Sequence, residues 1–239
     1  MSKSNLRAVF VDNIGAAYLP AAIELSKYFS HMYFHVAYQS PFPYVAPCKT
    51  GDGYDEIELI INFWDKLDSF DVVIFGDIYF EDWGIALRKM GKLVFGGGQS
   101  EDIETNRNLF YGMLERCGMN NGEYTTIKGI SKLKSYLKNK KNLFIKVSYF
   151  RGQFESFNWV SQAHNGVLLD EIEYNLGPLG DTIEFIVQQP IKADAEIGFD
   201  GYAVNGQLPK HFVQGIEIKN AGYLGKADIR FCLRSSLRF

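Results

Sequence analysis

Apolar residues along the first hundred positions fall into short runs separated by segments of helical spacing. The runs are rich in β-branched and aromatic residues and predict buried strands at 8–12, 32–38, 71–75 and 92–95. The intervening segments predict helices at 20–29, 57–67 and 83–90. Strands that alternate with helices form a parallel sheet covered on both faces, so residues 1–99 are expected to be a doubly wound α/β domain.

The pattern changes after Gln99, where we expect a domain boundary. A helix is predicted to begin at Ser100, a suitable N-cap followed by acidic residues, and to end before Gly118. A second helix is predicted over 131–139. Strand-like segments separated by Gly, Pro, Asn and Asp are predicted at 143–149, 166–169, 182–188, 197–204 and 212–218. Their mixed polar faces favour an antiparallel sheet, which makes this half of the chain α+β.

Composition narrows the classes of function. The 239-residue chain is 46% hydrophobic and 22% charged, as in ordinary globular proteins, and its net charge of −3 gives no general attraction to nucleic acid or anionic lipid. No apolar stretch approaches the ~20 residues that cross a bilayer, and no signal-peptide pattern is present. A cytoplasmic protein without nucleic-acid or membrane partners is expected. The cysteines, Cys48, Cys117 and Cys232, lie far apart in the sequence and are interpreted as reduced thiols.

Three features that could indicate a site have simpler structural interpretations. His31 and His35 lie in a predicted strand, where four residues span about 13 Å, too far for one metal ion. The glycine run 96–98 follows a strand but lacks the G-x-G-x-x-G spacing of dinucleotide-binding proteins. The lysines between 128 and 141 surround an apolar helical stripe, which is typical of a solvated helix face.

The most informative candidate is Lys146, in the apolar strand 143–149. A lysine in such a strand is costly to bury without an anionic partner, and Arg151 and Gly152 follow it in a predicted tight turn. A phosphate group would satisfy both cations. The alternative is an exposed strand lysine beside an ordinary hairpin, and this segment alone does not decide between the two.

Taken in order, several segments resemble the ATP-grasp superfamily, and most closely the branch that contains phosphoribosylamine–glycine ligase. These segments are the helix start with Arg107, the strand with Lys146, the turn at Arg151, and the runs 186–191, 196–202 and 215–219. The resemblance covers roughly 71–226 and depends on ordered spacing, since each motif alone is weak. It implies a Rossmann-like pre-ATP-grasp domain, a first ATP-grasp subdomain and an incomplete second subdomain, at 1–99, 100–187 and 188–239.

The resemblance also implies roles for single residues around the phosphates. Arg107 would contact the nucleotide phosphates, and Lys146 would reach the adenine and the α-phosphate. Arg151, Gly152 and Glu155 belong to the loop that would fold over the phosphates, where Arg151 would have a catalytic role.

Further residues would hold the nucleoside and the terminal phosphate. Gln188 and Gln189 stand where the family reads the adenine edge, Glu196 where it binds the ribose hydroxyls, and Lys219 where a catalytic lysine contacts the γ-phosphate. The pattern departs from the family at two points. Asn106 replaces a common acid before Arg107, and glutamine occupies a hinge position often held by glutamate.

The activity that the resemblance implies is an ATP-dependent carboxylate–amine ligase. In that reaction ATP phosphorylates a carboxylate, and an amine attacks the acyl phosphate to give an amide. Mg²⁺ ions neutralise the triphosphate, and no covalent nucleophile of the protein is required. The carboxylate and amine are not identified by the sequence.

The end of the sequence leads to a separate expectation. After Lys226 it holds one acid, Asp228, and three arginines, so no Mg²⁺ ligand can be assigned. We therefore expect a truncated clamp that is inactive by itself, with exposed apolar surface that favours self-association into homo-oligomers. Two alternatives stay open: a nucleotide-binding module without catalysis, and an unrelated α/β binding protein.

Overall fold

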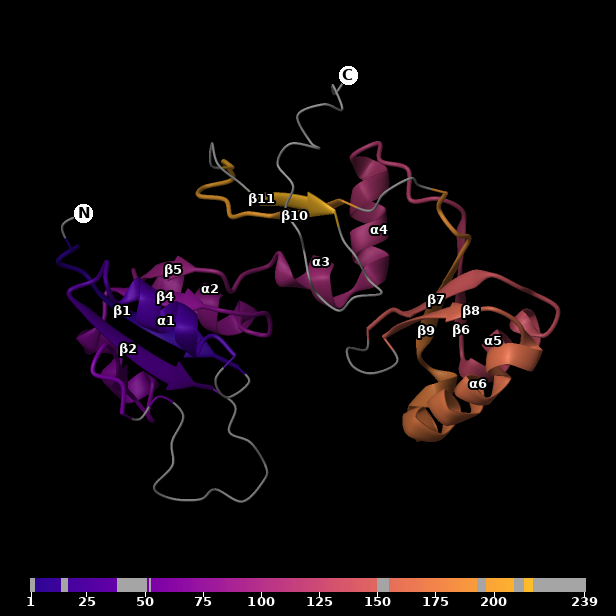
Figure 1. The fold of residues 1–239 in the computed structure, drawn as a ribbon, viewed down its shortest axis with the longest axis horizontal. Coiled ribbons are helices and arrows are strands. Elements are labelled where there is room, and N and C mark those ends of the chain that lie inside the picture. Colours follow the sequence, from indigo (N-terminus) through magenta and orange to yellow (C-terminus); the bar gives the residue numbers. More distant parts are fainter. Residues whose placement is uncertain are drawn as a thin grey trace. The chain divides into compact units, whose positions relative to one another are not determined.

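The structure, a computed structural model, describes residues 3–13, 17–37, 51, 53–149, 155–192, 197–208 and 213–216. The chain forms two compact units, Met1–Gln188 and Gln189–Phe239. The first unit contains a five-stranded and a four-stranded sheet, and the second contains a two-stranded sheet (Figure 1). No helix in the described ranges has the length and apolar character needed to span a membrane.

The first sheet is parallel, with strand order β3-β2-β1-β4-β5. Its elements are β1 (Arg7–Asp12), α1 (Leu19–Leu25), β2 (His31–Val36), β3 (Glu58–Leu59), the 3₁₀ helix η1 (Trp64–Ser69), β4 (Val72–Phe75), α2 (Glu81–Lys89) and β5 (Leu93–Phe95). Ala8 and Phe10 of β1 share a core with α1, whereas Val9 and Val11 share one with α2. Both faces of β1 are thus buried, which explains its uninterrupted apolar run. The predicted doubly wound α/β arrangement is confirmed.

The helix predicted over 57–67 is wrong. Residues 58–59 form the edge strand β3, and η1 follows. Ile57, Ile60 and Phe63 are buried at three-residue intervals, which imitates helical spacing. The amide of Ile60, however, donates to the carbonyl of Phe34 in β2 at 2.9 Å. Pairing with a strand that is distant in the sequence overrides the local pattern.

The glycine run 96–98 is explained by close packing against α2. A β-carbon on Gly84 would lie 2.1 Å from the carbonyl oxygen of Gly97. Gly97 itself has φ +50°, and a β-carbon there would lie 2.7 Å from an aromatic ring. The guanidinium of Arg88 donates to the carbonyls of Gly97 and Gly96, the latter at 2.6 Å. Packing and this cation account for the glycines without a bound phosphate.

His35 is the buried histidine of β2, with 7% of its surface exposed. Its Nδ1 lies 3.0 Å from the carbonyl oxygen of Ile60, and its ring packs against Phe63 and Trp83. Burial lowers the pKa of His35, against the smaller opposing effect of the hydrogen bond to Ile60. The unfolded chain takes up a proton near pH 6.5, whereas folded His35 does so only at lower pH. The stability present at neutral pH is therefore lost progressively as the pH falls below about 6.5.

We expect the free energy of unfolding to decrease between about pH 7.5 and about pH 5.5, and to decrease less in His35→Gln, because the variant cannot take up that proton. Urea denaturation at both pH values measures the difference. His31→Gln is the matched control. His31 lies on β2 as His35 does, but its side chain is exposed and contacts Glu58 of β3. Equal pH dependence in the wild type and His35→Gln would contradict the assignment.

The helix predicted from Ser100 is divided into α3 (Glu101–Thr105) and α4 (Arg107–Arg116). Asn106 between them is extended, and its side chain accepts hydrogen bonds from two amides in the first turn of α4, so it is the N-cap of α4. Ser100, the predicted N-cap, makes no capping hydrogen bond. Glu101 instead accepts from the amide of Phe80 at 2.9 Å and so serves the start of α2.

The second sheet is antiparallel, with strand order β6-β9-β7-β8. Its elements are β6 (Tyr124–Lys128), α5 (Ile130–Leu137), β7 (Leu143–Val147), β8 (Ser156–Trp159), α6 (Gln162–Leu176), the 3₁₀ helix η2 (Gly177–Asp181) and β9 (Glu184–Gln188). Leu133 of α5 and Leu169 of α6 share a core with Ile145 and Val187 of the sheet. Both helices lie beside the sheet in Figure 1. The predicted antiparallel α+β half is confirmed.

The strand predicted at 166–169 is wrong, because these residues lie inside α6. The helix begins after Ser161, whose side chain accepts a hydrogen bond from the amide of His164. Its buried residues are Gly166, Leu169, Ile172 and Leu176, one face of a helix. The short apolar run around Leu169 is thus the buried part of a helical stripe.

The second unit contains β10 (Ile197–Asp200) paired antiparallel with β11 (Val213–Ile216). Ile197 pairs with Ile216, and Asp200 with Val213. Between them, Val204 and Gln207 form an isolated bridge around Asn205 and Gly206, which both have positive φ. Strands were predicted in both places, at 197–204 and 212–218.

Candidate functional site

The antiparallel sheet has a mixed polar face opposite α5 and α6. Ile145 and Val147 point into the core with these helices, so Lys146 between them points to the other side. Lys146 pairs with Ile186, and Phe144 pairs with Gln188, which places these side chains on one face. We call the surface formed by Phe144, Lys146, Glu184, Ile186 and Gln188 the Lys146 face.

Lys146 is a half-buried cation on this face. Its Nζ donates to the hydroxyl of Tyr111 in α4 at 3.1 Å and lies 5.7 Å from the centre of the Tyr111 ring. Among the described residues, no ion pair involves Lys146. The contact that the structure gives its ammonium is thus with a neutral hydroxyl and an aromatic ring. An ammonium ion in that position favours an anionic ligand.

Gln188 is buried at the end of β9, with 5% of its surface exposed. Its Oε1 accepts from the Tyr111 hydroxyl at 3.0 Å, and its Nε2 donates to the carbonyl of Asn121 at 2.6 Å. Both ends of the side-chain amide thus bind the protein. Gln189, the next residue, is exposed, so of the two glutamines it has the side chain that is accessible to a ligand.

Arg107 and Glu155, both predicted to lie near phosphates, form an ion pair with each other. The Nε of Arg107 also donates to the carbonyl of Val147 at 3.2 Å, and its backbone amide donates to the carbonyl of Ser148 at 3.1 Å. These bonds attach the start of α4 to the end of β7, next to Lys146. The structure therefore brings Arg107, Lys146 and Glu155 to one end of the sheet.

Three further residues near Lys146 were not predicted from the sequence: Tyr111, Asn121 and Ser148. Tyr111 lies one helical turn after Arg107, a spacing that places both on the same side of α4 and that could have identified it. The side-chain Nδ2 of Asn121 donates to the backbone carbonyl of Tyr111 at 3.1 Å. Ser148 lies two residues after Lys146 and buries a hydroxyl that has no hydrogen-bond partner among the described residues. No sequence signal distinguishes Asn121 or Ser148 from ordinary turn residues.

Four predicted site residues lie outside the described residues: Arg151, Gly152, Glu196 and Lys219. Within the described ranges, no group of three or more His, Cys, Asp or Glu side chains could hold a metal ion.

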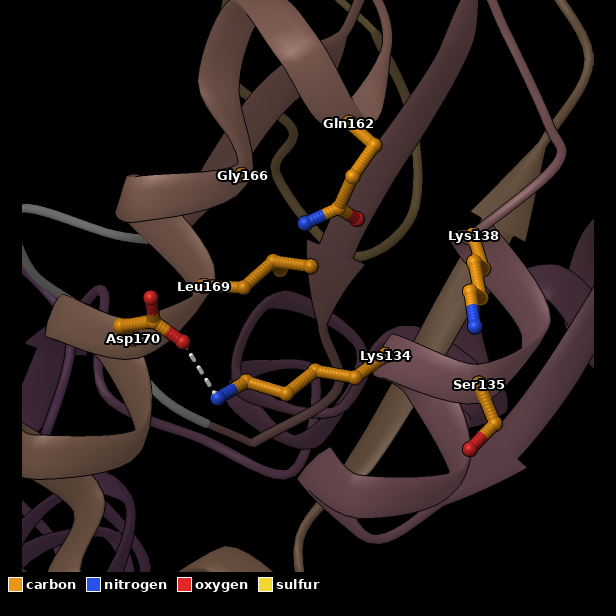
Figure 2. A pocket seen from close by; sticks show the side chains of 7 residues that line it. All are labelled: Lys134, Ser135, Lys138, Gln162, Gly166, Leu169 and Asp170. Carbon is orange, nitrogen blue, oxygen red and sulfur yellow. Dashed lines mark hydrogen bonds and ion pairs between the residues drawn. The ribbon is translucent and has the colours of Figure 1, made fainter.

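A groove of about 320 Å³ lies between α5 and α6. Figure 2 shows Lys134 extended across it to Asp170, with Nζ 2.6 Å from Oδ1. Hydrogen bonds to Asp170 and Glu173 raise the pKa of Lys134. This cation is thus already paired. The residues that line the groove include none of the predicted nucleotide-binding residues.

Solved structures similar to this chain share one fold. A RimK domain ATP-grasp protein from Sphaerobacter thermophilus has a TM-score of 0.58 at 12% identity, covering 92% of this chain and 76% of its own. Phosphoribosylamine–glycine ligase from Thermotoga maritima also scores 0.58 at 12% identity, covering 88% and 49%. N5-carboxyaminoimidazole synthetase from Staphylococcus aureus scores 0.56 at 13% identity, covering 91% and 55%.

Sequence comparisons add nothing to this likeness, since no protein-family model and no curated protein matches the chain. The chain spans about half the length of the Staphylococcus and Thermotoga enzymes. The match extends over both the parallel and the antiparallel sheet, as its coverage of this chain requires. The resemblance seen in the sequence is thus confirmed at the level of the fold, and this chain has the ATP-grasp fold.

Proposed function

We propose that this chain binds ATP at the Lys146 face and acts in the ATP-dependent joining of a carboxylate to an amine. The observation that carries the proposal is the half-buried Lys146 ammonium, which donates to a neutral hydroxyl and forms no ion pair with a carboxylate among the described residues. A nucleotide phosphate would supply the missing negative charge. The S. aureus synthetase, which shares the fold at 12% identity, has been solved in complex with ADP.

The proposed roles of single residues are those that the sequence resemblance implies. Lys146 would contact the α-phosphate and adenine, Arg107 the phosphates, and Gln189 with the strand end at Gln188 the adenine edge. By resemblance alone, Arg151 and Gly152 would cover the phosphates, Glu196 would bind the ribose and Lys219 would contact the γ-phosphate. The acyl acceptor and donor would be a carboxylate and an amine of unassigned identity.

Calorimetric titration with ATP, in the presence and absence of Mg²⁺, tests the binding proposal. We expect saturable binding of ATP that weakens with added salt, because phosphate contacts are largely electrostatic. Adenosine and inorganic triphosphate, each lacking half of the ligand, should bind more weakly. Absence of ATP binding under both conditions would refute the proposal. Release of ADP and phosphate that depends on an added carboxylate and amine would extend it to catalysis.

A further prediction concerns the ion pair between Arg107 and Glu155. In Glu155→Gln the negative charge is removed, so Arg107 becomes available to a phosphate and one repulsive charge near the ligand is lost. We expect ATP to bind about two- to fivefold more tightly, the effect of one partly exposed charge. Calorimetry on the variant measures this gain.

Glu115→Gln is the matched control for that variant. Glu115 lies on α4 as Arg107 does, but its carboxylate accepts from the Tyr124 hydroxyl and is exposed. The Glu115→Gln variant removes one negative charge, as Glu155→Gln does, but leaves the ion pair between Arg107 and Glu155 intact. An equal gain in both variants would indicate a general charge effect, and weaker binding in Glu155→Gln would show that Glu155 itself supports the ligand.

A further inference from the structure

The hydroxyl of Tyr111 joins the two best-placed residues of the proposed site. It accepts from the Nζ of Lys146 at 3.1 Å and donates to the Oε1 of Gln188 at 3.0 Å. Lys146 belongs to β7 and Gln188 to β9, so one side chain of α4 connects two strands of the sheet. Tyr111 has no role in the sequence resemblance.

The directions of these hydrogen bonds are fixed by the groups involved. The Nε2 of Gln188 lies 2.6 Å from the carbonyl oxygen of Asn121, which can only accept, so the amide orientation is set and Oε1 faces Tyr111. Because Oε1 of Gln188 can only accept, the Tyr111 hydroxyl must donate its single hydrogen to it. Its oxygen is then available only as an acceptor, and the Lys146 ammonium is the donor that it meets.

Tyr111 is itself held firmly in place. It is 4% exposed, the only buried residue of α4. Its ring packs edge-on against Tyr124 of β6, with centroids 4.7 Å apart, and its carbonyl accepts from the side chain of Asn121. Lys146, Tyr111 and Gln188 therefore each donate one hydrogen bond to the next group in the series, which ends at the carbonyl of Asn121. Because Tyr111 uses one of the three ammonium hydrogens, two are left for a ligand.

We propose that Tyr111 is a positioning residue for the nucleotide site, which fixes the Lys146 ammonium and the strand end at Gln188 relative to each other. The inference rests on the proposed function, since it assigns to Lys146 the contact with phosphate. The Tyr111 hydroxyl is a neutral acceptor and differs in its effect from a carboxylate in the same place. It orients the ammonium but leaves its full charge for the anion.

Tyr111→Phe tests the inference, because it removes the hydroxyl and keeps the ring. ATP affinity should fall about five- to tenfold, the effect of losing one ordinary hydrogen bond, because the variant keeps the Lys146 charge and loses only the group that orients it. Tyr124→Phe is the matched control: it also removes a tyrosine hydroxyl from this aromatic pair, but that hydroxyl binds exposed Glu115. It should bind ATP as the wild type does. Thermal denaturation of both variants checks that they are folded at the temperature of the titration.

A double-mutant cycle separates positioning from a general structural role. If Tyr111 acts through Lys146, adding Tyr111→Phe to Lys146→Met should change ATP affinity by less than twofold. An unchanged affinity in Tyr111→Phe, or an equal loss with and without Lys146, would overturn the inference. Failure of the proposed function looks different, because then the wild type does not bind ATP or Lys146→Met binds it equally well.

Discussion

Replacing Lys146 by methionine is expected to weaken ATP binding by roughly 10- to 100-fold, the range for the loss of a charged hydrogen bond in a partly desolvated site. Methionine keeps most of the apolar stem and removes only the ammonium. The variant should fold normally, because Lys146 makes no ion pair with the described residues and Tyr111 keeps its bond to Gln188. Calorimetric titration with ATP measures the effect.

Lys132→Met is the matched control for this variant. Lys132 is an exposed lysine of α5, a helix that packs on the opposite face of the same sheet. The Lys132→Met variant changes the net charge by the same amount as Lys146→Met. Because Lys132 lies away from the Lys146 face, ATP affinity should remain within about twofold of the wild type. Similar losses in both variants would point to non-specific attraction, and normal binding in Lys146→Met would remove the site from this face.

The fold could largely be predicted from the sequence because its strongest signals are local. The continuous apolar run of β1 indicates a strand buried on both faces, and the core with residues of α1 and α2 on either side agrees. Segments whose state depends on distant partners could not be predicted. Helical spacing is shown by Ile57, Ile60 and Phe63, yet residues 58–59 pair with β2 and belong to the sheet.

The candidate site was predictable only in part, for a related reason. Lys146 stands out because a cation in an apolar strand is unusual in any fold. Tyr111 does not stand out in the sequence, since a tyrosine on an amphipathic helix is expected to be an ordinary core residue. Its role depends on the contacts of its side chain with Lys146 and Gln188, which belong to strands distant in the sequence. The pairing of Arg107 with Glu155, 48 residues later, is likewise set by tertiary structure.

Replacing Gly84 by alanine is expected to have a second large effect, on the stability of the fold and not on ligand binding. Gly84 lies inside α2, where alanine is normally the better helix former by up to about 1 kcal/mol. Helix propensity alone thus predicts that Gly84→Ala stabilises the protein. The tertiary contact predicts the opposite. A β-carbon would lie 2.1 Å from the carbonyl oxygen and 2.6 Å from the carbonyl carbon of Gly97, which are backbone atoms that no rotamer change can move.

We expect Gly84→Ala to lower the free energy of unfolding by about 3 kcal/mol, the upper part of the range for overpacking. Gly112→Ala is the matched control, because Gly112 also lies inside a helix, α4, and its β-carbon would meet only the end of the Arg116 side chain at 3.9 Å. That variant should be stabilised by about 0.5–1 kcal/mol. Urea denaturation of the two variants therefore gives changes of opposite sign. If both glycines behave alike, the close approach of α2 to the 96–98 run is wrong, and so is the structural explanation of those glycines.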